Sequence, residues 1–120
     1  MLPSRHRLRR SSELLRVRQK GRRWHHPLIT LLVYSQIPAE GRAETPSPSR
    51  FAFVAGRVVG GAVQRNRTKR QLREVVHQML PRLAPGYDCI VIARPLSATA
   101  DFNELQVGME LLFSRANLVQ

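Results

Sequence analysis

The hydrophobic residues of this chain fall into short blocks that are separated by glycine, proline and charged residues. Some blocks are five to eight residues long and rich in β-branched or aromatic residues, a pattern typical of strands. In other blocks hydrophobic residues recur at every third or fourth position, a pattern typical of amphipathic helices. We therefore expect strands over 28–35, 51–55 and 87–93, an optional short strand over 57–59, and helices over about 13–20, 62–80 and 102–116.

The predicted helices carry, at their ends, residues that commonly start and stop helices. Ser12 is placed to cap the first helix, and Gly21 follows its end. Pro81 ends the second helix because proline cannot continue the helical hydrogen-bond pattern. Asp101 and Glu104 have the spacing of a capping box at the start of the last helix. These boundaries give the element order α-β-β-(β)-α-β-α.

This order, in a chain of 120 residues, predicts a single α/β domain (an α+β sandwich) over 1–120, in which helices pack on one sheet. The near-continuous apolar stretch over 28–35 predicts a strand that is buried on both faces. Residues 1–10 are basic, and we expect them to form a flexible arm. Residues 36–50 contain three prolines among polar residues, which predicts a surface loop.

The composition excludes several classes of protein. Hydrophobic residues make up 42% of the chain, which excludes a disordered polar chain and allows a proper core. The single cysteine, Cys89, excludes a disulfide framework and a cysteine-rich zinc site, and it suits a reducing compartment. The longest apolar run, over 28–34, is far shorter than the roughly 20 residues of a membrane span. We therefore expect no membrane partner.

The charge of the chain is strongly positive and unevenly distributed. Twenty Lys and Arg residues stand against eight Asp and Glu residues, which gives a formal net charge of +12. The excess is confined to residues 1–23, with nine basic residues and one acidic residue, and residues 65–74, with five and one. Like charges at this density repel one another and destabilise the compact state. Two such clusters therefore indicate a polyanionic partner that neutralises them.

The second predicted helix separates its hydrophobic and charged residues onto opposite faces. Its apolar stripe consists of Thr68, Leu72, Val75, Val76 and Met79, and the opposite face carries Arg65, Asn66, Arg67, Lys69, Arg70 and Arg73. A solvated helix face usually mixes opposite charges at i, i+4 spacing, but Arg65–Lys69 and Lys69–Arg73 are like-charge pairs. Such a face is destabilising unless phosphates neutralise it, so we predict that it contacts nucleic acid. Gly60 and Gly61, directly before the helix, let backbone amides approach a phosphate at a helix N-terminus, where anions are favoured.

The segment 60–74, Gly-Gly-Ala-Val-Gln-Arg-Asn-Arg-Thr-Lys-Arg-Gln-Leu-Arg-Glu, closely resembles the signature of the bacterial ribonuclease P protein component. The core of this resemblance is the Arg-Asn-Arg element, followed by Lys-Arg and Arg-Glu. The other segments follow the order of the family: a basic N-terminal arm, a short helix that ends at Gly21, two strands, and Tyr-Asp-Cys-Ile-Val-Ile-Ala-Arg-Pro over 87–95 before a closing helix. The resemblance covers about residues 5–117.

The resemblance implies an α/β sandwich with a left-handed crossover around the signature helix, whereas the general rule for such crossovers is right-handed. It also implies a protein that joins the ribonuclease P catalytic RNA, one protein per RNA, and assists endonucleolytic removal of the 5′ leader from precursor tRNA in the bacterial cytoplasm. The RNA would carry catalysis and bind Mg²⁺, so we expect no catalytic residue, metal site or cofactor in the protein itself.

The resemblance also implies two sets of contact residues. The catalytic RNA would contact Arg57, Gly60, Gly61, Arg65, Asn66, Arg67, Lys69, Arg70 and Arg73. The leader would lie in a cleft between the first helix and the sheet and contact Arg9, Arg10, Leu14, Arg18, Phe51 and Phe53.

Four positions depart from the family pattern. Leu14 and Arg18 stand where the family often has phenylalanine, which can stack on leader bases. Leu14 retains only apolar contact, and Arg18 can stack through its planar guanidinium group. Gly61 stands where asparagine is common, and Arg57 where lysine is usual.

The remaining aromatic residues and the histidines leave alternatives open. Phe51 and Phe53 are candidates for leader contact, but strand alternation sends both to one face, which can also be the core. Trp24 is either an anchor at the start of a strand or a stacking platform, and we favour the anchor. His25 and His26 are interpreted as a surface turn rather than a metal site, because adjacent histidines rarely share a metal.

Other functional classes fit these residues less well than this family does. No carboxylate pair, Ser/His/Asp set or Cys/His pair indicates a protein active site, and a protein nuclease needs several metal-binding carboxylates. A ribosomal or general RNA-binding protein without a processing role stays open, and it would bind tRNA with and without a leader equally well. A helix-turn-helix DNA-binding regulator needs a helix directly before the basic one, where strand and glycine are predicted.

Overall fold

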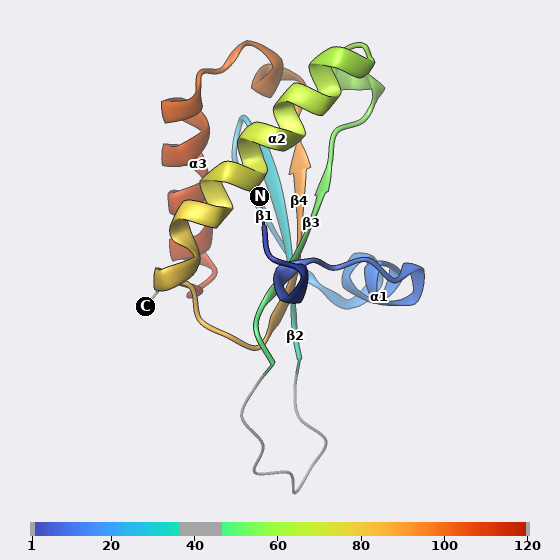
Figure 1. The fold of residues 1–120 in the computed structure, drawn as a ribbon, viewed down its shortest axis with the longest axis vertical. Helices are drawn as coiled ribbons and strands as arrows, with labels where there is room; N and C mark the ends of the chain where they lie inside the picture. Colours follow the sequence, from blue (N-terminus) through green and yellow to red (C-terminus); the bar gives the residue numbers. More distant parts are fainter. Residues whose placement is uncertain (1, 37–46, 120) are drawn as a thin grey trace, which may run out of the picture.

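The computed structural model describes residues 2–36 and 47–119, and Figure 1 shows their arrangement. Its helices and strands are α1 (Ser11–Lys20), β1 (Arg22–His25), β2 (Ile29–Ser35), β3 (Arg50–Val54), α2 (Ala62–Met79), β4 (Tyr87–Ala93) and α3 (Phe102–Arg115). Short 3-10 helices stand at Ser4–His6, Arg57–Val59, Leu80–Arg82 and Pro95–Thr99. Most of the surface loop expected over 36–50 lies outside the described residues.

The sheet is mixed and has the strand order β1-β2-β4-β3. β1 pairs antiparallel with β2, and β2 with β4, whereas β3 and β4 are parallel. Parallel neighbours need a crossover connection, and α2 provides it between β3 and β4. The predicted α/β class is confirmed, while the handedness of this crossover stays a prediction. β1 and β3 are left as the two edges of the sheet.

The helices cover both faces of the sheet. α2 and α3 lie on one face and α1 on the other, as Figure 1 shows. Alternate residues of β2 serve the two layers: Leu31 and Val33 belong to the core beneath α2 and α3, and Leu32 belongs to the cluster beneath α1. The predicted burial of this strand on both faces is therefore confirmed.

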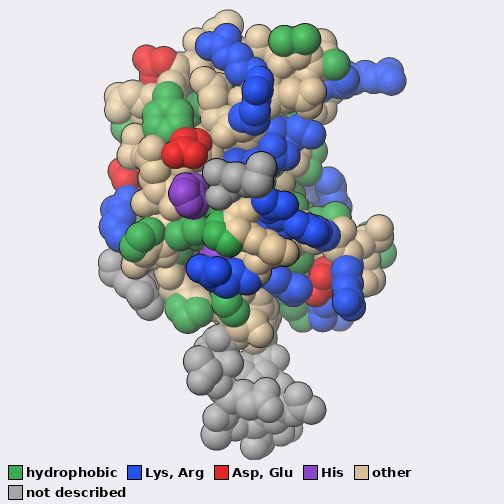
Figure 2. Space-filling view, in the orientation of Figure 1, with side chains coloured by type: hydrophobic (Ala, Val, Ile, Leu, Met, Phe, Trp, Pro, Cys, Tyr) green, Lys and Arg blue, Asp and Glu red, His purple; other side chains and the backbone are tan. Residues whose placement is uncertain are grey.

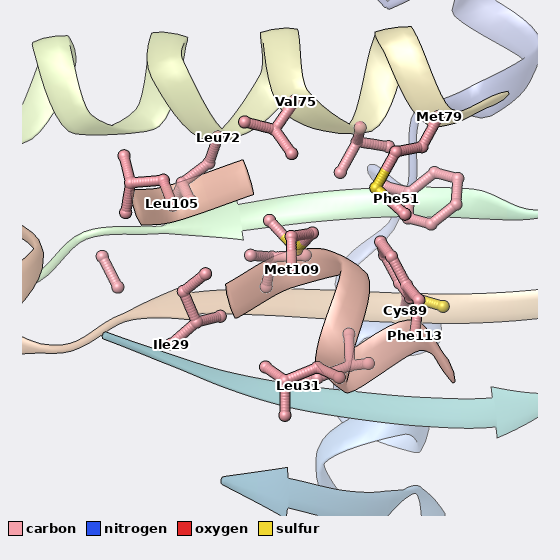
Figure 3. Close-up of a cluster of buried hydrophobic side chains, with 14 of the residues drawn as sticks. Ile29, Leu31, Phe51, Leu72, Val75, Met79, Cys89, Leu105, Met109 and Phe113 are labelled. Carbon is pink, nitrogen blue, oxygen red and sulfur yellow. The ribbon is translucent and has the colours of Figure 1, made fainter. Parts of the chain in front are cut away.

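The larger of the two cores holds α2 in a fixed rotation. Leu72, Val75 and Met79 of α2 point toward Met109 and Phe113 of α3 and the sheet beneath (Figure 3). All five side chains have no exposed surface, and burial of each stabilises the fold by about 1.5–3 kcal/mol. Because this stripe faces inward, the opposite side of α2 faces outward.

The ends of the helices only partly agree with the sequence. The capping box of α3 is confirmed, because Asp101 Oδ1 accepts a hydrogen bond from the Glu104 amide at 2.8 Å and Glu104 Oε1 accepts one from the Asp101 amide at 3.1 Å. The predicted cap at Ser12 is wrong. Ser12 lies inside α1, which has Arg10 as its N-cap and no side-chain cap bond.

One predicted strand is absent, and one strand of the structure was not predicted. Residues 57–59 form a 3-10 turn rather than a strand, closed by a hydrogen bond from the Gly60 amide to the Arg57 carbonyl. The additional strand is instead β1, whose sequence Arg-Arg-Trp-His has no apolar alternation and only one partly buried residue. It forms because the exposed edge of β2 offers hydrogen-bonding groups, which is a tertiary effect. The surface turn predicted for His25 and His26 is therefore only partly right, because His25 ends β1 and His26 alone lies in the turn to β2.

Residues 2–10 are not a free arm, contrary to the expectation for residues 1–10. Leu2 and Leu8 are 2% and 4% exposed and pack into the two cores. The Leu8 amide donates to the Phe51 carbonyl at 2.9 Å, and Arg7 Nε donates to the Leu2 carbonyl at 2.8 Å. Two isolated leucines are too weak a pattern to predict this packing, which brings the basic residues of the segment alongside β3.

Candidate RNA-binding surfaces

The outward side of α2 is the first candidate surface. The five residues of the predicted apolar stripe are the buried residues of this helix, so the predicted rotation is confirmed. The opposite side, here named the α2 basic face, consists of Arg65, Asn66, Arg67, Lys69, Arg70 and Arg73. Asn66, Lys69, Arg70 and Arg73 line, with Val63, a shallow depression of about 430 Å³ on this face. Figure 2 shows Lys and Arg side chains spread over this side of the molecule.

The acidic residues that the structure describes do not neutralise this face. Glu13 and Asp88 bind Arg50, and Glu110 binds Arg82. Asp101 and Glu104 cap α3, and Glu74 lies 4.0 Å from His77. Within the described residues, therefore, no ion pair reaches the α2 basic face, and its like-charge neighbours remain free to bind an anion.

The N-terminus of α2 adjoins this face and contains the two predicted glycines. Gly60 has φ of +140° and ψ of −161°, a conformation that is essentially restricted to glycine. Gly61 is the N-cap of α2 and has an ordinary extended backbone. A Cβ atom at this position would have no neighbouring atom within 4 Å. Arg57 is exposed on the 3-10 turn just before them. The backbone conformation therefore requires glycine at position 60. It does not require glycine at position 61, where the helix simply lacks a capping side chain.

The second candidate surface is a groove along the edge strand β3. α1 and α2 pack on opposite faces of the sheet, and among the described residues the β3 edge between them is paired only at Phe51, by the N-terminal segment. The groove has a volume of about 520 Å³ and is here named the β3 groove. It is lined by Leu2, Arg7, Leu8, Arg9, Leu14, Arg18, Phe51, Ala52, Phe53, Val54 and Arg73.

Most of the predicted leader residues meet in this groove. Five of the six line it, and Arg10 is exposed at the start of α1 without lining it. Leu14 and Arg18 are one helical turn apart and therefore present the same flank of α1 to the groove. The groove thus combines an apolar floor with cations on both rims.

The two phenylalanines of β3 differ in their availability. Phe53 is half-buried, and the Arg73 guanidinium lies over its ring at 5.9 Å from the centroid. Phe51 is only 2% exposed and packs edge-on against Phe113, with ring centroids 6.0 Å apart. Of the two roles left open for Phe51, packing in the core is the one that the structure shows, although Phe51 still borders the groove.

Sequence reasoning missed several residues of the β3 groove. Arg7 falls in the segment expected to be a free arm, and Ala52 and Val54 carry no chemical signal in the sequence. Arg73 is predicted for the α2 basic face alone, but it lines both surfaces. Its stacking on Phe53 joins the two surfaces into one basic region. The only sequence feature that could have indicated this double role of Arg73 is its position one helical turn beyond Lys69.

An ion-pair network holds α1 beside the groove. Arg50 of β3 donates to both carboxylate oxygens of Asp88 at 2.9 and 2.8 Å and reaches Glu13 of α1 at 2.7 Å. Asp88 also accepts a hydrogen bond from Gln36 Nε2 at 2.7 Å. The hydrogen bonds from Arg50 to Asp88 and Glu13 raise the pKa of Arg50. This network positions α1 without offering free charge to a ligand.

The comparison with known proteins gives the decisive observation. The family model described as "Ribonuclease P" matches residues 2–117. This chain belongs to the ribonuclease P protein family. The "Ribonuclease P protein component" of Chloroflexus aurantiacus is 43% identical over 95% of this chain and 79% of the relative. That of Roseiflexus castenholzii is 38% identical over 96% of this chain and 88% of the relative.

Solved structures of the ribonuclease P protein share the fold. The protein from Staphylococcus aureus has a TM-score of 0.80 at 21% identity and covers 96% of this chain and 98% of its own. The protein from Thermotoga maritima has a TM-score of 0.76 at 25% identity and covers 92% and 97%. The family is the protein subunit of ribonuclease P, which acts in the processing of the tRNA 5′ end.

Two further features bear on the site. None of the described helices combines the length and the apolar character that crossing a membrane requires. The described part of the chain also holds no group of three or more His, Cys, Asp or Glu side chains arranged around a common point. The acidic side chains present serve ion pairs and caps, as described above.

Proposed function

We propose that the α2 basic face and the N-terminus of α2 bind the catalytic RNA of ribonuclease P, while the β3 groove binds the 5′ leader of precursor tRNA. The single observation that carries this proposal is the basic region itself. Cations of α2 that no described acid neutralises adjoin, through Arg73, a groove that is narrow, partly apolar and lined by further arginines. A folded RNA offers the extended phosphate surface that the helix requires, and an unpaired strand fits the groove.

The protein contributes binding and electrostatics to the reaction. In this proposal, one protein joins one catalytic RNA in the bacterial cytoplasm, and Mg²⁺ is held by the RNA. Cations that neutralise crowded phosphates lower the repulsion between leader and catalytic RNA, so substrate and Mg²⁺ bind together more tightly. Leu14 supplies apolar contact to a base, whereas Phe53 and Arg18 supply a ring and a planar cation for stacking.

The reconstituted holoenzyme tests the proposal directly. We expect the protein to stimulate leader cleavage by a bacterial catalytic RNA at low Mg²⁺. The triple variant Arg67→Gln, Lys69→Gln, Arg70→Gln avoids Arg73 and the groove. It should lower the slope of log affinity for the catalytic RNA against log salt by about 2–3, or roughly 0.7–0.9 for each phosphate that is no longer neutralised. Arg82→Gln, whose charge is paired with Glu110, is the matched control. A triple variant with an unchanged slope would remove this face from the interface.

The second arm of the experiment separates the groove from the helix face. Arg18→Ala combined with Phe53→Ala should weaken binding of precursor tRNA much more than binding of mature tRNA, because only the precursor carries a leader. Leu15→Ala, on a 53% exposed residue of α1 outside the groove, is the control. Equal losses for precursor and mature tRNA would contradict the leader assignment and favour general RNA binding.

A further inference from the structure

A second groove lies at the opposite edge of the sheet, where β1 meets the C-terminal ends of α1 and α3. Its volume is about 590 Å³, and its lining includes Lys20, Arg22, Trp24, Tyr34, Tyr87 and Arg115; it is here named the β1 groove. Nothing in the proposed roles of α2 and β3 uses these residues. Three strand spacings, roughly 14 Å, separate β1 from β3, so the two grooves are distinct.

The strand register places aromatic rings along the β1 groove. Arg22 stands opposite Val33 and Trp24 opposite Leu31, which puts both side chains on the face that α3 covers. Tyr87, which packs on the same core, lies further along that face. The rings of Trp24 and Tyr87 are half-buried, so the core fixes them while part of each stays accessible. Trp24 therefore packs on the core, in agreement with the predicted anchor role, while the rest of its ring is accessible to a ligand.

The charge of the β1 groove is entirely positive. Lys20, Arg22 and Arg115 are exposed, and no Asp or Glu of the described residues lines the groove. In the same part of the chain none of the three takes part in an ion pair. The Arg22 guanidinium instead lies 5.4 Å from the Trp24 ring centroid. Stacking rings flanked by free arginines are the combination that binds unpaired nucleic acid, because bases stack on the rings while the cations hold phosphates.

A basic track connects this groove with the side of α1 that faces away from the β3 groove. Tyr34 lines both the β1 groove and an adjoining pocket that contains Arg5 and Arg16, together with Arg50, whose charge is paired with Asp88. The Arg16 guanidinium lies 5.5 Å from the Tyr34 ring centroid. Arg5 and Arg50 are close in sequence to Arg7 and Phe51 of the β3 groove, so the track begins beside the proposed leader site.

We propose that the β1 groove binds an unpaired segment of the substrate RNA, upstream of the leader nucleotides held in the β3 groove. This inference rests on the proposed function for its choice of substrate RNA. Trp24 and Tyr87 stack on bases, and Lys20, Arg22 and Arg115 bind the phosphates. α1 then stands between two stretches of one bound strand. An acidic protein segment would use the cations but has no need of the ring faces, which favours RNA as the occupant.

Trp24 is the only tryptophan of the chain, so its fluorescence reports on this groove alone. Titration of the protein with a single-stranded RNA oligonucleotide should quench Trp24 emission. The double variant Arg22→Gln, Arg115→Gln should weaken the affinity measured in this way by at least about tenfold. Arg82→Gln should behave like the parent protein, and Phe53→Ala should retain the quenching. Absence of quenching, or quenching that is lost in Phe53→Ala but kept in the double variant, overturns the proposal.

Two further arms identify the occupant. Equal quenching by polyglutamate would assign the groove to an acidic peptide, and a change in Trp24 emission on adding catalytic RNA alone would assign it to that RNA; either result overturns the substrate assignment. In the holoenzyme, lengthening the leader should tighten precursor binding with the parent protein, and the double variant should lose that gain. This readout is independent of the Arg18 and Phe53 variants, so a failure of the β3 assignment is recognised separately.

Discussion

Phe51 and Phe53 lie two residues apart on the same side of β3, yet their neighbours give them different roles. Phe51 lies against Phe113 near the end of α3 and is part of the core. Phe53 lies further along the strand, beneath Arg73 of α2, and borders the groove. At the scale of single residues, contact with another element decides whether a ring is enclosed by the core or stays accessible.

The paired glycines before α2 give a test at the same scale. Gly61→Asn adds a capping side chain to an N-cap that lacks one. It should therefore stabilise the protein by roughly a few tenths of a kcal/mol. Gly60→Asn forces a side chain into a conformation reserved for glycine and should cost about 1–3 kcal/mol. Urea unfolding of both variants measures the difference. Equal effects from the two substitutions would contradict the assignment of the conformational requirement to Gly60.

α1 shows how an element depends on its attachments. Its ten residues are too few for a stable isolated helix, and Val17 is its only buried residue. The network of Arg50, Asp88 and Glu13 supplies a second attachment to β3 and β4. Because α1 forms one wall of the β3 groove, this network also maintains the shape of the groove.

Removing the central arginine of this network should therefore be costly. Arg50→Met leaves Asp88, which is 1% exposed, with the Gln36 amide as its side-chain partner, and we expect a loss of about 2–4 kcal/mol. Arg82→Met breaks the exposed pair with Glu110 and should cost at most about 1 kcal/mol. Denaturant unfolding of the two variants provides the comparison. If both lost the same stability, the buried network would have no special role.

At the scale of the whole molecule, the positive charge gathers in basic surfaces on α2 and along both grooves. Figure 2 shows Lys and Arg side chains across the face formed by α2 and α1, while most acidic side chains in this view lie on the left, toward α3. The net charge of +12 is therefore concentrated in these surfaces rather than spread as a uniform excess. Self-repulsion in this region destabilises the free protein, and a bound RNA relieves it.

This repulsion predicts that salt stabilises the protein in the absence of RNA. Raising NaCl from about 10 mM to about 1 M shortens the screening length from about 30 Å to about 3 Å, so the melting temperature should rise by several degrees, on the order of 5 °C. The variant Arg67→Gln, Lys69→Gln, Arg70→Gln should show a smaller rise, because part of the repulsion is already gone. Differential scanning calorimetry over the salt series measures both. A melting temperature that fell with salt would show that attractive ion pairs dominate instead.

Local patterns in the sequence predicted a large part of the fold. The buried stripe of α2, the capping box of α3 and the strands β2 and β4 agree with their predictions, because each depends on residues within a few positions of one another. β1 and the packed N-terminal segment were missed. Arg22–His25 has no apolar pattern, and Leu2 and Leu8 are isolated in the sequence although both are buried in the structure. Their positions depend on partners that are distant in the chain.

Helical periodicity assigns each residue of α2 to a side and was therefore enough to reveal its cationic face, and the family resemblance pointed to five residues that line the β3 groove. Long-range contacts, by contrast, place Arg73 over Phe53, bury Phe51 and bring Trp24 into one groove with Arg115. Each of these relations joins segments that are 20 or more residues apart. Their proximity results from the burial of apolar surface around the whole sheet, which no local pattern encodes.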